Sequence, residues 1–282
     1  MKKGLVLEGG AMRGLFTAGV MDVLMENEIK FDGAVGVSAG AAFGCNYKSG
    51  QIGRVLRYNT RFCADKRYSG LGCLIKEGSI FSTSFCYGEV PLKYDTFDFE
   101  AYKKNPMDFF VVATDVETGK AVYHKYEGNE DSGFDWIRAS ASMPLVSTIV
   151  EINGQKLLDG GIADSIPVKF FESQGYEKNI AVLTQPRDYT KSKNSLLPLI
   201  KMKYRKYPEF VKAVAERHIM YNDTLEYIRR REEEGGLFVI APDIDLPVGK
   251  VEKDPEKLKN AYNIGRRIAE EKLESIKKFL DE

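Results

Sequence analysis

Several patterns are missing from this sequence of 282 residues. No stretch comes near the roughly 20 consecutive apolar residues of a membrane-spanning helix. The apolar run after Lys2 and Lys3 already ends at Glu8, too early for a signal peptide. Lys plus Arg and Asp plus Glu each count 41, so a formal net charge of zero gives no general attraction to nucleic acid. We therefore expect a cytoplasmic protein that does not bind nucleic acid.

Cysteine and histidine are also scarce. The chain has four cysteines and two histidines, and no C-x-x-C pair or other metal-binding spacing. We therefore expect reduced structural thiols, and neither a metal ion nor a cofactor. The residues are Cys45, Cys63, Cys73, Cys86, His124 and His218.

The first 50 residues alternate between two patterns. Residues 4–10 (GLVLEGG) and 33–38 (GAVGVS) are short apolar runs typical of buried parallel strands. The segments that follow each run have the apolar spacing of helices, with Leu15, Val20, Val23 and Leu24 on one of them. This order predicts an α/β fold whose strands are joined by right-handed crossovers.

The rest of the chain adds further elements. A turn at residues 117–119 separates two predicted strands, and Asn153-Gly154 predicts a type I′ hairpin within residues 148–161. We also expect a short helix that stops before Pro144, strands at 179–185 and 236–242, helices over 195–234, and a final helix with Asp254 as N-cap. Residues 51–107 give no clear pattern.

Ser38 lies in a G-x-S-x-G motif between a predicted strand and a predicted helix. Gly36 and Gly40 flank it, and small residues surround it. Such a turn exposes a nucleophilic hydroxyl, and the dipole of the following helix favours developing negative charge. The alternative is a serine that only caps the helix.

A glycine-rich loop follows the first predicted strand. Its residues are Gly9, Gly10, Ala11, Met12, Arg13 and Gly14. Such a loop leaves amides free to bind an oxyanion or a phosphate. A dinucleotide site fits poorly, because the middle glycine is Ala11 and no acidic residue ends the second strand; a P-loop lacks its Lys-Ser/Thr. Arg13 could orient the loop, meet an anionic head group or form a surface ion pair.

A serine nucleophile needs a base. In a triad of the order Ser, Asp, His the histidine could only be His218, which lies within a predicted charged helix, and His124 lies within a strand and looks structural. Asp159 ends another predicted strand and precedes Gly160 and Gly161. Alone it could be a turn-forming Asp-Gly; beside the other two motifs it becomes the candidate base.

Together these motifs resemble the patatin-like phospholipase family. GGAMRG at 9–14, GVSAG at 36–40 and DGG at 159–161 occur in the family's order, over residues 4–185, although Ala11 stands where a glycine is usual. The resemblance implies a three-layer α/β/α sandwich with a mostly parallel sheet. It also implies a Ser-Asp dyad, with Ser38 as nucleophile, Asp159 as general base and residues 9–14 as the oxyanion loop.

The resemblance further implies fatty-acyl ester substrates such as phospholipids, lysophospholipids or neutral glycerides. Three alternatives stay open: an acyltransferase or thioesterase using the same serine, a catalytically silent regulatory scaffold, and a nucleotide-binding protein. We expect a catalytic domain over 1–190 and a mainly helical extension over 191–282 packed on the same core. Residues 186–217 carry nine Lys or Arg against three acids, interleaved with aromatics. They could contact an anionic membrane peripherally, or form a solvated helix face.

Overall fold

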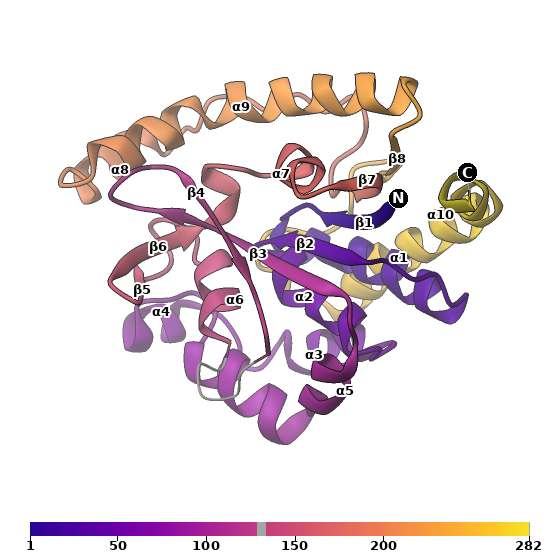
Figure 1. Cartoon of the computed structure of the whole chain (residues 1–282). Coiled ribbons are helices and arrows are strands. Elements are labelled where there is room, and N and C mark those ends of the chain that lie inside the picture. The colour runs from indigo at the N-terminus through magenta and orange to yellow at the C-terminus, as the bar shows by residue number, and fades with distance from the viewer. Residues whose placement is uncertain (129–133, 282) are drawn as a thin grey trace.

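The computed structural model describes residues 1–128 and 134–281, which form one mixed sheet of eight strands covered by helices (Figure 1). The strand order is β5-β6-β3-β2-β1-β7-β8, with β4 also paired to β3. The strands are β1 (Lys2–Leu7), β2 (Gly33–Val37), β3 (Asp108–Asp115), β4 (Ala121–Lys125), β5 (Val150–Ile152), β6 (Gln155–Asp159), β7 (Tyr176–Val182) and β8 (Leu237–Ile240). Strands β3, β2, β1, β7 and β8 are parallel to their neighbours in that row, while β4, β5 and β6 pair antiparallel. The predicted α/β class and mostly parallel sheet are confirmed.

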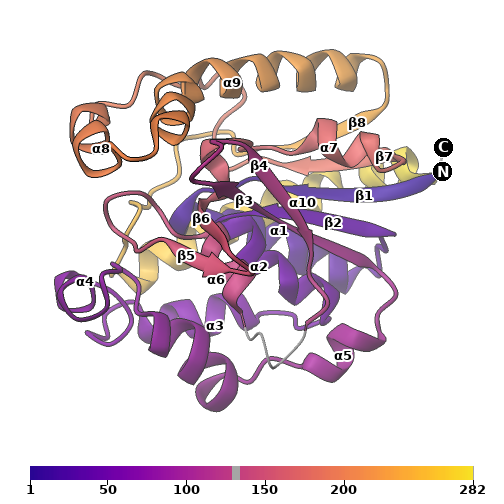
Figure 2. The same ribbon diagram turned by 60° about the vertical axis from the view of Figure 1, so that its left-hand side comes forward.

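Helices form the two outer layers of the predicted sandwich. The main ones are α1 (Gly14–Glu26), α2 (Ala39–Lys48), α3 (Arg54–Phe62), α4 (Leu71–Glu77), α5 (Phe99–Lys104), α6 (Asp135–Ser140), α7 (Val168–Ser173), α8 (Leu197–Lys203), α9 (Pro208–Glu233) and α10 (Pro255–Asp281). Figures 1 and 2 show α7 and α9 on one face of the sheet, and α1, α2 and α10 on the other.

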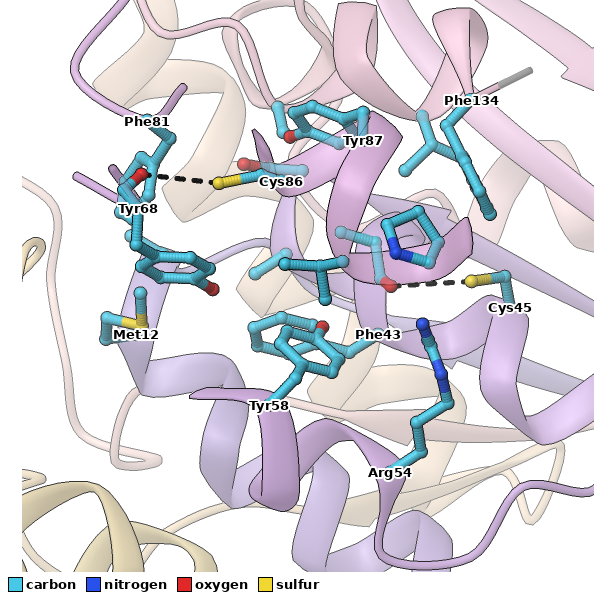
Figure 3. A pocket seen from close by; sticks show the side chains of 18 of the residues that line it. Met12, Phe43, Cys45, Arg54, Tyr58, Tyr68, Phe81, Cys86, Tyr87 and Phe134 are labelled. Carbon is cyan, nitrogen blue, oxygen red and sulfur yellow. Dashed lines mark hydrogen bonds between the residues drawn. The ribbon is translucent and has the colours of Figure 1, made fainter. Parts of the chain in front are cut away.

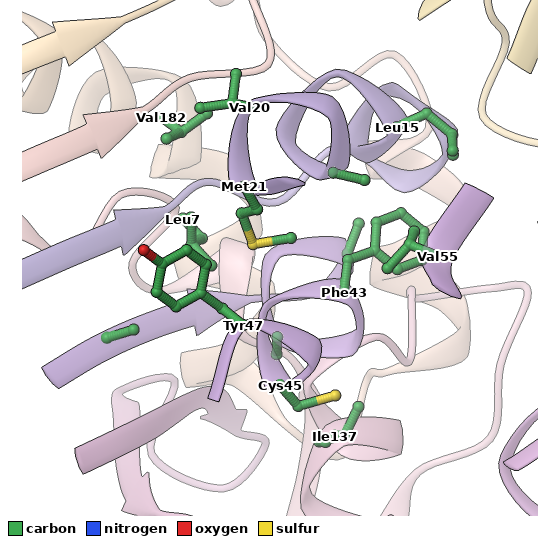
Figure 4. Close-up of a cluster of buried hydrophobic side chains, with 14 of the residues drawn as sticks. Leu7, Leu15, Val20, Met21, Phe43, Cys45, Tyr47, Val55, Ile137 and Val182 are labelled. Atoms are coloured by element: carbon green, nitrogen blue, oxygen red, sulfur yellow. The ribbon is translucent and has the colours of Figure 1, made fainter. Parts of the chain in front are cut away.

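The strand sequences explain why both faces are covered. Leu5 and Leu7 of β1 belong to the core cluster beneath α1, α2 and α10, whereas Val6 between them belongs to the cluster beneath α7 and α9. All three side chains are fully buried. Alternate side chains of one continuous apolar run therefore pack into the cores on both faces of the sheet, as expected for a central parallel strand. Figure 4 shows part of the larger cluster, with Leu7 of the sheet beside Met21 and Tyr47 of the helices.

Turn and cap residues act as the sequence predicted. Asn153 and Gly154 both have positive φ, 51° and 80°, in the hairpin between β5 and β6. The Asp254 side chain accepts a hydrogen bond from the Glu256 amide, 2.9 Å long, at the start of α10. Among the residues that the structure describes, no helix combines the length and apolarity needed to cross a bilayer.

Residues 51–107, which the sequence left open, fold over one end of the α2 layer. They contain α3, α4, α5 and the π-helical segment η2 (Phe85–Tyr94), which includes Pro91. An aromatic cluster holds these pieces together, in which the ring of Phe62 packs on those of Phe85 and Tyr94. Helix α3 keeps a regular buried face that includes Val55, Tyr58 and Phe62, whereas the short helices α4 and α5 and the π-helical η2 give little periodicity to read.

Helices α1 and α10 cross in close contact. A Cβ built on Gly19 would lie 2.1 Å from the carbonyl oxygen of Tyr262, and one built on Gly265 would lie 2.0 Å from that of Phe16. The Tyr262 hydroxyl donates a 2.6 Å hydrogen bond to the buried Asp22 carboxylate. The two helices therefore touch backbone to backbone at the crossing, next to a buried polar contact.

Candidate active site

Ser38 forms the sharp turn between β2 and α2. Its φ of 54° and ψ of −118° are unusual for a residue with a side chain. The Ser38 amide donates a 2.8 Å hydrogen bond to the Ser140 hydroxyl, which helps to hold the turn. The small neighbours are required by contacts: a Cβ on Gly40 would lie 2.3 Å from the Leu7 carbonyl oxygen, and one on Gly36 would lie 2.4 Å from that of Gly40. The strand-turn-helix context predicted for the motif is present.

Asp159 lies directly opposite this serine. The Ser38 hydroxyl donates to Asp159 Oδ2 over 2.7 Å, and the Gly161 amide donates to Oδ1 over 2.8 Å. Both residues are buried, with exposed fractions of 8% for Ser38 and 6% for Asp159. Burial raises the pKa of Asp159 above its ordinary value, while the Arg217 charge and the two hydrogen bonds oppose the rise. Such a carboxylate can accept a proton from the hydroxyl that it contacts.

The glycine-rich loop lies against the serine. A Cβ on Gly9 would be 2.9 Å from Ser38 Cβ, so the loop backbone runs beside the hydroxyl. The Arg13 amide donates to the Gly10 carbonyl, and the Gly14 amide is also used within the 3-10 turn. Within the described residues, the amides of residues 9–12 have no acceptor. Ala11 has φ 51°, which explains why glycine suits this position.

Gly160 and Gly161 shape the turn after Asp159. A Cβ on Gly160 would lie 2.1 Å from the Val112 carbonyl oxygen in β3, so only glycine lets β6 end this close to its neighbour. The Gly161 carbonyl accepts a hydrogen bond from Arg217 Nε, on α9.

Neither His124 nor His218 forms a hydrogen bond with Ser38 or Asp159 in the described part of the chain. The ring of His124 stacks on Trp136 at a centroid distance of 4.0 Å. The His218 ring nitrogen Nδ1 lies 3.0 Å from the carbonyl oxygen of Ala215 on its own helix. Within residues 1–128 and 134–281, no group of three or more His, Cys, Asp or Glu could hold a metal ion.

Sequence reasoning missed several supporting residues. Ser140 holds the Ser38 amide, and Thr184 donates from its hydroxyl to the Gly9 carbonyl over 3.0 Å. The buried Glu8 carboxylate accepts 2.6 Å and 2.7 Å bonds from the Thr184 amide and the Tyr221 hydroxyl. These partners come from distant parts of the chain, so only an explicit three-dimensional fold could reveal them.

An apolar pocket opens from Ser38. Residues of the loop, of α2, of the segment 51–107 and of α6 line it, and most are aromatic or aliphatic (Figure 3). The lining includes Met12, Phe43, Tyr58, Tyr68, Phe81, Tyr87, Val90, Phe134, Ile137 and Met143. The polar Arg54 in its wall is satisfied by the Asp95 carbonyl and by Asn46. The pocket therefore suits an extended apolar group next to the serine.

Comparison with known proteins agrees with this geometry. Residues 5–171 match the family model described as patatin-like phospholipase, which covers more than half of the chain. The chain belongs to the patatin-like phospholipase family. Residues 207–281 match a second model, described as a domain of unknown function (DUF6363).

The individual relatives of this patatin-like chain are under 30% identical to it in sequence. The uncharacterized protein YjjU of Escherichia coli is 29% identical over 300 residues, which cover 99% of this chain and 79% of that protein. Lysophospholipase nte1 of Aspergillus niger is 25% identical over 299 residues, which cover 98% of this chain but 18% of that protein. This chain therefore spans under a fifth of that lysophospholipase. The crystal structure of VipD from Legionella pneumophila superposes with a TM-score of 0.44 at 11% identity, covering 96% of this chain and 67% of that chain.

Proposed function

We propose that this protein hydrolyses fatty-acyl esters of lipids through an acyl-serine intermediate. The observation that carries the proposal is the 2.7 Å hydrogen bond from the Ser38 hydroxyl to the buried Asp159 carboxylate, formed at a strained turn beside free amides. Family membership supports an acyl hydrolase, and the lysophospholipase relative supports a lipid substrate.

The first half-reaction forms the acyl-enzyme. Asp159 Oδ2 accepts the hydroxyl proton while Ser38 Oγ bonds to the acyl carbon, and the carbonyl oxygen takes the negative charge. The amides of residues 9–12 stabilise this oxyanion. The tetrahedral intermediate then expels the alcohol, which takes the proton from Asp159.

The second half-reaction releases the fatty acid. Water attacks the acyl carbon and gives its proton to Asp159, and Ser38 Oγ leaves with that proton. An ordinary aspartate is a weak base for a hydroxyl. The burial that raises the pKa of Asp159 strengthens it as a base, which allows a mechanism without histidine.

The decisive experiment combines labelling with turnover. A fluorophosphonate should label Ser38, located by peptide mapping, and p-nitrophenyl esters should be hydrolysed. We expect Ser38→Ala to abolish labelling and hydrolysis, and Asp159→Asn to slow hydrolysis by about 10²–10⁴-fold. Ser49→Ala and Asp164→Asn, which change a buried serine and a half-buried aspartate that do not contact Ser38 or Asp159, are matched controls.

The outcomes separate the alternatives. Wild-type-like turnover by either variant of the pair would contradict the dyad. Acyl transfer to an added alcohol or thiol that outruns hydrolysis would instead indicate an acyltransferase. A folded protein that neither labels nor turns over any ester, with or without lipid vesicles, would indicate a silent scaffold.

We also propose that the α8 region contacts an anionic lipid surface. Leu196, Leu199 and Met202 have exposed fractions of 51%, 49% and 70%, while Ile200 faces the core. Five exposed basic residues surround them, namely Lys193, Lys201, Lys203, Arg205 and Lys206. Apolar side chains ringed by cations complement an anionic bilayer surface. The aromatic residues Tyr204 and Phe210 lie in the core, so the aliphatic residues carry this proposal.

Helix α4 also presents exposed apolar side chains to the side of the molecule on which α8 would contact the lipid surface. Figures 1 and 2 place α4 and α8 at the same end of the molecule, on either side of the β5-β6 hairpin. Leu71 and Ile75 of α4 have exposed fractions of 72% and 85%. In co-sedimentation, vesicles rich in phosphatidylglycerol should bind the protein and pure phosphatidylcholine vesicles should not. Met202→Asp should weaken binding, Ile52→Asp should not, and binding independent of anionic lipid would refute the proposal.

A further inference from the structure

The charges of four cationic side chains act on the two buried carboxyl groups of this region, Glu8 and Asp159. Arg13 belongs to the glycine-rich loop, whereas Lys191, Arg217 and Lys250 belong to the part of the chain that follows residue 190. Two of these three lie within or directly beside α9, the helix that covers the sheet above the site (Figure 1). No motif of the first 185 residues predicts them.

Contacts bring Arg217 to the dyad. Its Nε donates to the Gly161 carbonyl, and another guanidinium nitrogen lies 3.4 Å from the Ser165 hydroxyl. The same nitrogen and Asp159 Oδ1 each lie 3.0 Å from the point where a Cβ on Gly161 would be. The Arg217 charge therefore adjoins the proposed base.

Lys191 extends this group toward the glycine-rich loop. Its Nζ lies 4.3 Å from the ring centroid of Tyr221, whose hydroxyl donates to Glu8. Burial, with the charges of Arg217, Arg13 and Lys250, lowers the pKa of Lys191 to about 8, although the Glu8 charge opposes this. Arg13, Arg217 and Lys250, which come from three further segments of the chain, thus repel the charge of Lys191.

These cations lack the partners that other enclosed cations have. Among the described residues, six arginines are buried or half-buried. Four of them form ion pairs, namely Arg54, Arg138, Arg231 and Arg266. Arg13 and Arg217 do not, and the Nε of Arg13 is buried with no hydrogen-bond acceptor in the described part of the chain. The half-buried Lys191 and the exposed Lys250 likewise have no carboxylate within 4.0 Å among these residues.

The balance of charges in this region is positive, which indicates that a bound partner would be an anion. Four cations face two carboxylates, Glu8 and Asp159, and burial raises the pKa of both carboxyl groups. The excess is positive, and Arg13, Lys191 and Arg217 are half-buried, where unpaired cations are costly, so an anion would stabilise the arrangement. Guanidinium and ammonium donors together suit the oxygens of a phosphate group.

We propose that Arg13, Lys191, Arg217 and Lys250 form a subsite for the phosphate group of the substrate, next to the acyl-binding pocket. This inference rests on the proposed lipid hydrolase function and deepens it. The C-terminal part of the chain thereby gains a specific role, because it supplies three of the four cations that hold the phosphate while Ser38 attacks the neighbouring ester.

Binding can be measured without turnover. Titration calorimetry with sn-glycerol 3-phosphate should show binding to the wild-type protein, and glycerol should show none. Lys191→Met and Lys250→Gln should each weaken binding about tenfold or more, whereas Lys191→Arg and the exposed Lys104→Met should not. Tighter binding of glycerol 3-phosphate than of inorganic phosphate would identify a head group as the source, and equal binding would identify a site for the free anion. Absence of binding, or binding undiminished in both Lys variants, would overturn the subsite.

Kinetics supply a second test. Dihexanoylphosphatidic acid and dihexanoylglycerol carry the same acyl esters and differ in the phosphate. Lys191→Met and Lys250→Gln should raise KM for the phosphatidic acid about tenfold and leave turnover of dihexanoylglycerol unchanged. Equal losses for both esters would refute the subsite but not the hydrolase. If neither ester is hydrolysed, the proposed function fails, and calorimetry still tests the anion site.

Discussion

The Ser38 hydroxyl donates a 2.7 Å hydrogen bond to Asp159, a residue 121 positions further along the chain. Two sharp local structures make this contact possible: the strained turn after β2 and the close approach of β6 to β3 at Gly160. Each feature of the pair leads to a measurable expectation.

Backbone strain at Ser38 should be visible in stability. Because φ is 54° there, a residue without a side chain relieves strain of about 1–3 kcal/mol. We expect Ser38→Gly to melt a few °C above Ser38→Ala in calorimetry, while both lack activity. Ala42→Gly, at an ordinary helical position of α2, should instead lower the melting temperature. Equal melting of the two Ser38 variants would show that the turn is unstrained.

Asp159 should couple activity to pH. Because burial raises its pKa, kcat/KM should rise with pH through an apparent pKa above the ordinary value of 3.8. A pH-rate profile measures this. A profile flat from pH 4 upward would contradict Asp159 as the base.

The same shift should lower stability as pH rises. The folded protein holds the Asp159 proton more tightly than the unfolded chain, so the free energy of unfolding falls as pH rises between the two pKa values, and the loss persists above them. We therefore expect Asp159→Asn to gain more melting temperature over wild type at pH 8 than at pH 4. The other buried carboxyl groups contribute equally to the stability of both proteins, so their contributions cancel in this comparison. A melting-temperature difference between variant and wild type that is no more favourable to the variant at pH 8 than at pH 4 would argue against this sign.

The glycine-rich loop should tolerate no side chain at its first position. Gly9→Ala would place a Cβ 2.9 Å from Ser38 Cβ and push the loop amides away. We expect hydrolysis to fall about 10²–10³-fold, the cost of losing one oxyanion donor. The control is Gly72→Ala, where no atom lies within 4 Å. Equal activity of both variants would exclude the loop as the oxyanion site.

Pocket shape should control the acyl chain. Val90 is buried and lines the pocket. We expect Val90→Trp to keep hydrolysis of p-nitrophenyl acetate and to lose that of the decanoate, because the indole occupies space for the longer chain. Ile75→Trp, at a site exposed by 85%, should change neither rate. Parallel losses on both esters would mean that the chain lies elsewhere.

Sequence reasoning reached the strands, the turn residues and the three motifs, because each depends on local chemistry. An apolar run, Asn153-Gly154 and the small residues around Ser38 constrain the backbone within a few residues. The strand predicted at 236–242 is present as β8, and it pairs with β7 in the sheet. The catalytic roles of Ser38 and Asp159 stay predictions that the experiments above address.

Other features could not be predicted for a physical reason. The fold of residues 51–107 depends on ring contacts such as Phe62 with Phe85, which have no period along the chain. The contacts of Arg217 with Gly161 and of Tyr221 with Glu8 join residues 56 and 213 positions apart. Interactions of this range appear only when the whole fold is assembled.

The crossing of α1 and α10 has an evolutionary consequence. Gly19 and Gly265 each meet a backbone carbonyl of the opposite helix, so a larger residue at either position displaces both helices. Helix α1 begins at Gly14, where the glycine-rich loop ends, so the displacement would reach the loop. The two glycines should therefore covary among homologues. Relatives that keep both would dock their last helix in the same way, and relatives that have lost one should have lost the other.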